Sequence, residues 1–132
     1  MSDETPTTAR VLLIDDETLL LRAMSRGLER YHRVVTAAGG REALRILADD
    51  HGFDAVICDM HMPDMSGEEV YGFLHAHHAP LARRFIVMTG NLEGDETREF
   101  LRRSGCVGLH KPFKLAELNT ALERLIRATS QP

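Results

Sequence analysis

Residues 55–63 of this chain, AVICDMHMP, contain the pattern that decides the fold. Four apolar residues lead directly into Asp59, and the stretch that follows ends in Pro63, which predicts a loop. A short run that is apolar at every position is typical of a parallel strand with helices over both of its faces. We therefore predict a buried strand at 55–58, with a carboxylate where the strand meets its loop.

Similar runs recur along the chain, and segments with helical periodicity separate them. We predict strands at 11–14, 33–37, 55–58, 85–88 and 107–110. Strands that alternate with helices form βαβ units, in which the strands run parallel and the helices cover the sheet. The sequence therefore predicts an α/β fold with a five-stranded parallel sheet and helices on both faces.

The helical segments have apolar faces of unequal strength. We expect helices at about 17–30, around 43–48, and at 67–77, 95–103 and 115–128. The docking face of the first helix is expected to consist of Leu19, Leu20, Ala23, Met24, Gly27 and Leu28. Ser66 stands three residues before Glu69, which is typical of a capping box at the start of the third helix. The fourth helix has only Phe100 and Leu101 as large apolar residues, so we expect it to dock weakly.

The composition indicates one globular domain. The chain has 132 residues, of which 43% are apolar and 27% charged, which is ordinary for a single folded domain. We expect a flexible N-terminus at 1–9, one domain at 10–128 and a C-terminal tail at 129–132. A net charge of -4 with scattered basic residues argues against direct binding to nucleic acid.

Cysteine usage and hydropathy indicate the cellular compartment. Cys58 and Cys106 lack C-x-x-C spacing, which argues against a zinc or redox site and favours core thiols in a reducing environment. No apolar stretch approaches the ~20 residues that cross a bilayer, and residues 1–8 carry acidic instead of basic side chains. We therefore expect a cytoplasmic protein that does not contact a membrane.

Polar side chains stand where four of the predicted strands end. They are Asp15, Asp16, Asp59, Thr89 and Lys111. In an open parallel sheet the carboxyl ends of the strands meet at one edge, where ligands bind. Like charges 4 Å apart repel by on the order of 4 kcal/mol at an effective dielectric of 20, so three carboxylates need cations among them. Lys111 supplies one positive charge, and we expect Mg²⁺, which prefers oxygen ligands, to supply two more.

These residue types match the requirements of phosphoryl transfer. The reaction needs a nucleophile in line, with cations and a hydroxyl donor around the phosphoryl oxygens. We expect Asp59 to form an aspartyl phosphate, Thr89 to donate its hydroxyl group, and Lys111 to pair with another phosphoryl oxygen. Taken singly, an acidic pair is more often a cap, and a lysine beside a proline is more often solvated. The presence of all these residues together favours a phosphoryl-transfer site over those separate roles.

Four segments together resemble the signature set of two-component response-regulator receiver domains. They are LIDDE at 13–17, DMHMPDMSG at 59–67, MTG at 88–90 and KPF at 111–113. The resemblance spans about 10–128 and implies a flavodoxin-like, chemotaxis-receiver-like fold with strand order 2-1-3-4-5. It also implies a phosphorelay signalling domain, which is not an enzyme in the ordinary sense but catalyses its own phosphorylation and dephosphorylation.

The resemblance assigns roles to individual residues. It implies Asp59 as the phosphoacceptor, Asp16 and Asp59 as direct Mg²⁺ ligands, and Asp15 as a ligand through water. The third protein ligand is implied to be the backbone carbonyl of His61, whose side chain is then free to face the site entrance. The residues expected to modulate the site are His61, Gly90 and Asn91, although a neutral structural role for His61 stays open.

The resemblance also implies partners. The upstream partner is a histidine kinase or a histidine phosphotransfer domain. The downstream partner is a protein that binds the face formed by the fourth helix, the fifth strand and the last helix, at 95–103, 107–110 and 115–128.

One position departs from the family pattern. Gly108 stands three residues before Lys111, where the family usually has Tyr or Phe, so we do not expect signalling by rotation of an aromatic ring. The segment 104–110 is similar to shortened segments in receivers of hybrid histidine kinases. We expect no output domain in this chain, which leaves open a free-standing receiver or an excised piece of a hybrid kinase.

Two other functions are weighed against a phosphorylated receiver. Phosphatases of the haloacid dehalogenase type also use an aspartyl phosphate, Mg²⁺ and a lysine, but they carry D-x-D where this chain has Asp59-x-His61. A receiver-like module that is never phosphorylated would have lost a site residue, and none is lost. Three histidines, His75, His77 and His78, lack the i, i+4 spacing of a helical metal site and are expected at the surface or at a helix end.

Overall fold

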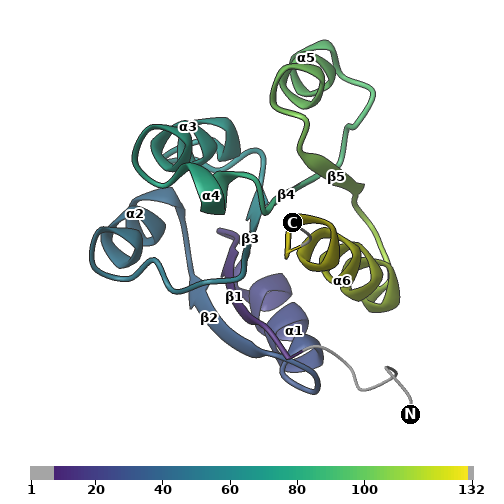
Figure 1. Cartoon of the computed structure of the whole chain (residues 1–132). Coiled ribbons are helices and arrows are strands. Elements are labelled where there is room, and N and C mark those ends of the chain that lie inside the picture. The colour runs from purple at the N-terminus through teal and green to yellow at the C-terminus, as the bar shows by residue number, and fades with distance from the viewer. Residues whose placement is uncertain (1–7, 131–132) are drawn as a thin grey trace.

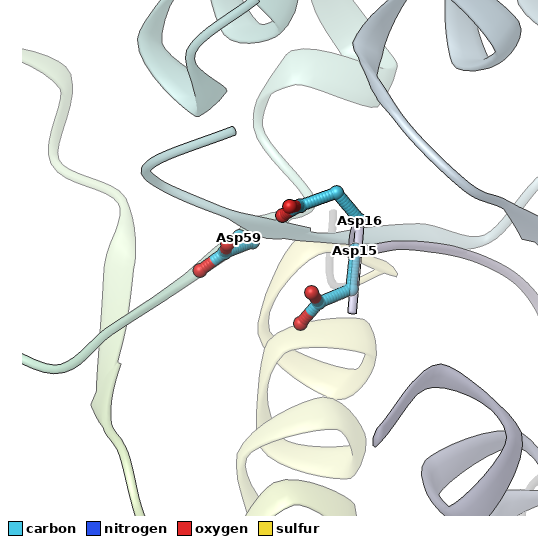
Figure 2. A group of neighbouring side chains, drawn as sticks. All are labelled: Asp15, Asp16 and Asp59. Carbon is cyan, nitrogen blue, oxygen red and sulfur yellow. The ribbon is translucent and has the colours of Figure 1, made fainter. Parts of the chain in front are cut away.

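Five parallel strands form one sheet at the centre of the computed structural model, which describes residues 8–130 (Figure 1). The strands are β1 (Arg10–Ile14), β2 (Arg33–Ala37), β3 (Ala55–Asp59), β4 (Phe85–Thr89) and β5 (Val107–His110). Their order is β2-β1-β3-β4-β5, which confirms the predicted α/β class and strand order. Because the strands are parallel, their carboxyl ends share one edge, where Asp15, Asp16 and Asp59 lie (Figure 2).

Helices cover both faces of the sheet. They are α1 (Thr18–Leu28), α2 (Gly40–Asp49), α3 (Gly67–His77), α4 (Ala79–Ala82), α5 (Asp95–Ser104) and α6 (Leu115–Ser130). Figure 1 shows α1 and α6 on one face, α2, α3 and α4 on the other, and α5 beside the edge strand β5. The one-turn helix α4, with Pro80 in its first turn, was not predicted. Helix α6 continues two residues into the predicted tail, while residues 1–7 and 131–132 of the predicted flexible ends lie outside the described residues.

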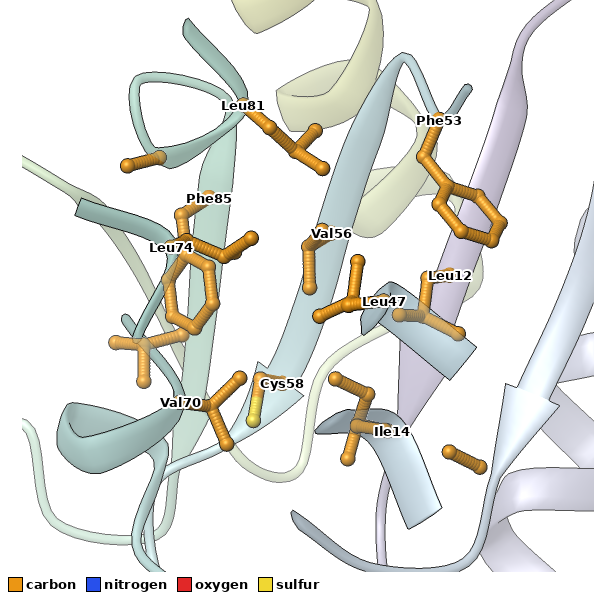
Figure 3. Packing of buried hydrophobic residues seen from close by; sticks show 14 of the residues in the cluster. Leu12, Ile14, Leu47, Phe53, Val56, Cys58, Val70, Leu74, Leu81 and Phe85 are labelled. Carbon is orange, nitrogen blue, oxygen red and sulfur yellow. The ribbon is translucent and has the colours of Figure 1, made fainter. Parts of the chain in front are cut away.

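Successive strand residues pack against opposite helical layers. Strand side chains that face α2 and α3 belong to one buried cluster, which includes Val87. Figure 3 shows further members of this cluster: Leu12, Ile14, Val56, Cys58 and Phe85. Their sequence neighbours belong to a second cluster with α1 and α6 and include Val11, Leu13, Ala55, Ile57, Ile86 and Met88. Three central strands are therefore buried on both faces, which is why their sequences are apolar at every position.

The predicted docking face of α1 is wrong in part. Leu19 is 81% exposed and Ala23 is also exposed, whereas Leu21, Met24 and Leu28 are buried. Residues spaced three and four apart lie on one side of a helix, and Leu21, Met24 and Leu28 have that spacing. The three consecutive leucines at 19–21 cannot all face the sheet, and Leu19 is the one turned towards solvent.

Local signals define the limits of α3 and α5. The Ser66 hydroxyl accepts a hydrogen bond from the backbone N–H of Glu69 at 3.1 Å, and the Glu69 carboxylate accepts one from the N–H of Ser66 at 2.9 Å. This pair confirms the predicted capping box. Helix α5 ends at Gly105, whose φ of 73° lies in the left-handed region that a residue without Cβ adopts easily. Only Thr97 and Phe100 are buried in α5, as its thin apolar face predicts.

The two cysteines are free thiols, with Cys58 buried and Cys106 half-buried. Burial raises the pKa of both thiols, so neither is primed to ionise. Among the helices of residues 8–130, none has the length and apolar character that crossing a bilayer requires.

Candidate functional site

Three carboxylates meet at the carboxyl edge of the sheet. Ligand oxygens of Asp15, Asp16 and Asp59 all lie within 4.8 Å of one another (Figure 2). Asp15 and Asp59 are buried, and Asp16 is partly exposed. The predicted convergence of these acids is confirmed. Within the described residues, no other group of three His, Cys, Asp or Glu side chains converges in this way.

Strand register places the acids. Ile14 pairs with Cys58, so the next residues, Asp15 and Asp59, stand at the same level on neighbouring strands. The Asp15 N–H donates to the carbonyl of Ala37 at 3.2 Å, which continues the parallel ladder past the end of β1. On the other side, the N–H of Met60 donates to the Met88 carbonyl at 2.8 Å. The backbone positions of both acids are therefore fixed by the sheet.

Lys111 brings a positive charge into the same pocket. Its Nζ lies 3.0 Å from Oδ2 of Asp15, 3.1 Å from Oδ1 of Asp59 and 3.5 Å from Oε1 of Glu17. The Lys111 N–H also donates to the Thr89 carbonyl at 2.7 Å, which anchors the lysine to β4. The sequence analysis missed Glu17, whose only signal was its place directly after the acidic pair.

Burial and the charges in the pocket change the pKa values of Asp59 and Lys111. Burial raises the pKa of Asp59, the hydrogen bond from Lys111 opposes that rise, and the nearby Asp15 adds to it. Burial alone would lower the pKa of Lys111, but its hydrogen bonds to Asp15 and Asp59 outweigh burial and raise it. Lys111 therefore stays charged, while the negative charge of Asp59 is only partly compensated.

The donor set of the pocket fits Mg²⁺. All three acids offer oxygen atoms, and their charges exceed that of Lys111. Both oxygens of Asp15 already accept hydrogen bonds, Oδ1 from the Glu17 N–H at 2.9 Å and Oδ2 from Lys111. Asp16 and Asp59 are thus the acids with more free oxygen lone pairs. The individual ligand roles, including that of the His61 carbonyl, stay predictions.

Thr89 and the residues after it form the second side of the pocket. Thr89 is buried, and its Oγ1 accepts a hydrogen bond from the Asn91 N–H at 3.1 Å. A Cβ on Gly90 would meet no atom within 4 Å, so there is open space beside this residue. The side chains of His61 and Asn91 are both exposed, which for His61 suits the expected position at the entrance.

Asp64 in the β3–α3 loop and Gly67, the first residue of α3, have structural roles that the sequence analysis missed. Asp64 accepts hydrogen bonds from the N–H groups of Arg41 at 3.0 Å and Gly40 at 3.2 Å, and the bond from Arg41 is the main cause of its lowered pKa. The loop is thereby tied to the first turn of α2. Gly67 approaches the pocket backbone so closely that a Cβ there would lie 2.6 Å from the Asp59 carbonyl oxygen.

The three histidines at 75, 77 and 78 lie in the last turn and at the C-cap of α3, which agrees with the prediction for them. His75 and His77 are exposed, and His78 is half-buried with its ring stacked on that of His51 at 3.5 Å between centroids. None of them belongs to the group of converging metal-ligand side chains.

An apolar hollow of about 410 Å³ lies beside the pocket. Leu20 and Met24 of α1 line one side, Phe113 and Leu115 line the other, and Lys111 is shared with the acidic pocket. The exposed Leu19 precedes Leu20 on the same helix.

Comparison with known sequences gives consistent matches. A family model described as "Response regulator receiver domain" matches residues 11–123. "Two-component response regulator ARR11" from Arabidopsis thaliana is 32% identical over 130 residues, which are 96% of this chain and 24% of that protein. "Transcriptional regulatory protein KdpE" from Mycobacterium tuberculosis is 36% identical over 118 residues, which are 89% of this chain and 50% of that protein. The chain therefore spans a quarter to a half of the length of these relatives.

Solved structures match along nearly their full length. A response regulator receiver domain protein from Clostridium thermocellum has a TM-score of 0.80 at 30% identity, with 92% of this chain and 97% of that chain covered. Chemotaxis protein CheY4 from Vibrio cholerae has a TM-score of 0.77 at 29% identity, with 90% of this chain and 99% of that chain covered.

Proposed function

This chain belongs to the response regulator receiver domain family, and from that premise we propose that Asp59 accepts a phosphoryl group from a phosphohistidine. Receiver domains are signalling domains of two-component systems and not classical enzymes, and membership implies an upstream histidine kinase. The observation that carries the proposal is the position of Asp59 between two further carboxylates and the Lys111 ammonium.

The proposed transfer forms one bond and breaks one bond. A carboxylate oxygen of Asp59 attacks the phosphorus, a P–O bond forms, and the P–N bond to the donor imidazole breaks. The imidazole leaves as a neutral ring after it takes up a proton. Lys111 is proposed to pair with one phosphoryl oxygen, and the Thr89 hydroxyl to donate to another.

Mg²⁺ is the proposed cofactor. Asp16 and Asp59 would hold it directly, Asp15 through water, and the His61 carbonyl would complete the protein ligands. When bound, the ion supplies positive charge that stabilises the phosphoryl oxygens. The excess of negative over positive side-chain charge in the pocket supports this assignment.

We propose that the phosphodonor protein docks over the apolar hollow. The phosphohistidine must reach Asp59 from the open edge of the sheet, and the hollow borders that edge through Lys111. A partner helix with an apolar face would cover Leu20 and Phe113 together with the exposed Leu19. The partner that we propose to present such a helix is a histidine kinase or a histidine phosphotransfer domain.

The proposed output face consists of α5, β5 and α6. Helix α5 packs through few buried residues, so a small change at Thr89 or Lys111 can shift it. His61, Gly90 and Asn91 are proposed to lie at the pocket entrance and to set how long the phosphoryl group persists. Receiver domains are typically cytoplasmic, and we propose the same location for this chain.

The direct test is covalent phosphorylation by a small phosphodonor such as acetyl phosphate with Mg²⁺. We expect one added phosphoryl group by intact-protein mass spectrometry, and its loss in hydroxylamine, which cleaves acyl phosphates. Asp59→Asn should abolish the addition, whereas Asp64→Asn, in the loop that follows β3 and outside the carboxylate group, should retain it. Retention of the phosphoryl group by Asp59→Asn would refute the assignment, and steady turnover of a phosphomonoester would favour a phosphatase instead.

A further inference from the structure

Gly108 is a point of unusually close packing in β5. A Cβ on this residue would lie 2.9 Å from Cδ2 of Leu92 and 3.0 Å from Cδ1 of Leu101. Gly108 pairs with Val87, and its neighbour Leu109 belongs to the cluster around α6, so Gly108 faces the α5 side of the sheet. The two leucines therefore fill the space that a side chain at position 108 would occupy.

The two leucines reach Gly108 from different elements. Leu101 belongs to α5, whereas Leu92 belongs to the loop between β4 and α5. That loop is a tight turn, in which the Gly94 N–H donates to the Asn91 carbonyl at 3.2 Å. Leu92 is thus held in a compact segment directly before α5.

Leu92 is also linked to the pocket. The residue before it, Asn91, donates its N–H to Oγ1 of Thr89 at 3.1 Å. The flanking Gly90 would meet no atom within 4 Å at its Cβ position, so there is open space beside the loop at this residue. A change in the Thr89 hydroxyl therefore reaches Leu92 within three residues, whereas Leu101 lies farther along the chain, inside α5.

We propose that Leu92 is a positioning residue that transmits occupancy of the pocket to α5, an inference that rests on the proposed phosphorylation of Asp59. Without a phosphoryl group, Thr89 holds the Asn91 N–H and Leu92 covers Gly108. When the Thr89 hydroxyl turns towards a phosphoryl oxygen, the Asn91 N–H follows it or loses its acceptor, and Leu92 moves away from Gly108. The loop that leads into α5 then loses its apolar contact with β5, and α5 shifts with the loop.

The test compares amide and leucine methyl NMR spectra with and without beryllofluoride and Mg²⁺, a non-covalent mimic of the phosphoryl group on Asp59. In the wild-type chain we expect shift changes at the Leu92 methyl groups and throughout α5. Leu92→Ala should still take up phosphate from acetyl phosphate but lose most of the α5 shift changes, and Leu92→Met should recover them. The matched control is Leu101→Ala, which removes the other leucine over Gly108 and should keep the α5 response.

Gly108→Ala supplies a second, independent readout. Its added methyl group should displace Leu92 and move the Leu92 methyl resonances towards their beryllofluoride positions before any ligand is added. Unchanged Leu92 resonances in this variant would overturn the inference, as would a full α5 response in Leu92→Ala or an equal loss in Leu101→Ala. A wild-type chain that takes up no phosphate would instead refute the proposed function, so the two failures are distinguishable.

Discussion

The Nζ atom of Lys111 lies 3.1 Å from Oδ1 of Asp59, so the lysine that follows β5 forms an ion pair with the acid at the end of β3. The same ammonium group lies 3.0 Å from the buried Asp15. One positive charge thus faces three carboxylates, and the folded chain holds negative charge that is only partly compensated. This imbalance makes the pocket costly for stability and suited to a divalent cation.

Asp59→Asn should stabilise the protein when Mg²⁺ is absent. Burial raises the pKa of Asp59 in the folded state, so the ionised carboxylate costs stability at every pH above that raised pKa. We expect a gain on the order of 1 kcal/mol in urea unfolding at neutral pH. Mg²⁺ should narrow the difference, because the ion stabilises the wild-type pocket. The control is Asp64→Asn, which should lower stability because Asp64 accepts backbone hydrogen bonds.

Gly67→Ala and Gly72→Ala should change stability in opposite directions. A Cβ at position 67 would lie 2.6 Å from the Asp59 carbonyl oxygen, so the backbone beside the pocket must move and phosphorylation should slow. A Cβ at position 72, inside α3, meets no atom within 4 Å. There alanine should stabilise by about 0.5–1 kcal/mol, because glycine is a poor helix former. Unfolding curves and acetyl phosphate labelling measure both effects.

Acid should weaken the link between β1 and the end of α2. The guanidinium of Arg10 hydrogen-bonds to Asp50 and lowers the pKa of that carboxyl group from 3.8 to about 2. A carboxyl group with a lowered folded pKa contributes its full stability above the unfolded value, and the contribution fades as pH falls from 3.8 towards 2. Urea unfolding across this range should show a steeper loss for the wild type than for Asp50→Asn. Parallel curves would contradict the prediction.

His32→Leu should destabilise the end of the sheet opposite the pocket. Nδ1 of the buried His32 accepts the Ala9 N–H at 3.0 Å, and Nε2 lies 2.8 Å from Oδ1 of Asn119 in α6. Leucine would leave a buried N–H without an acceptor, which costs about 1–3 kcal/mol. The same change at the exposed His110 should have little effect on urea unfolding.

Leu19→Ser should slow phosphoryl transfer from a protein donor without affecting a small one. Leu19 is 81% exposed on α1, close to the hollow where we propose that the donor docks. Loss of about 1 kcal/mol of contact corresponds to a rate about fivefold lower at subsaturating donor. Labelling by acetyl phosphate should stay at the wild-type rate. Tyr31→Ser, which alters the exposed Tyr31 after α1, is the matched control and should leave both rates unchanged.

The sequence predicted the order of helices and strands well because, in most segments, the residues that form the apolar pattern are also the residues that are buried in the fold. The apolar runs at β1, β3 and β4 are buried on both faces, and Ser66 and Glu69 cap α3 as their spacing indicates. The prediction was wrong where apolar residues exceeded what one face can bury, as at Leu19, and it missed the short helix α4. Which residues of α1 face the sheet depends on how the helix is rotated about its axis. That rotation is set by contacts with the sheet, and the local pattern of apolar residues does not determine it.

By itself the sequence determined the parallel α/β architecture and the identity of the polar residues at the strand ends, because both follow from local patterns of apolar and polar side chains. Only the tertiary structure decided that Lys111 bonds to both Asp15 and Asp59, that Asp64 holds the first turn of α2, and that Leu92 and Leu101 close over Gly108. The physical reason is that each of these contacts joins residues far apart in the chain. Their distances are set by strand register and helix packing across the whole sheet.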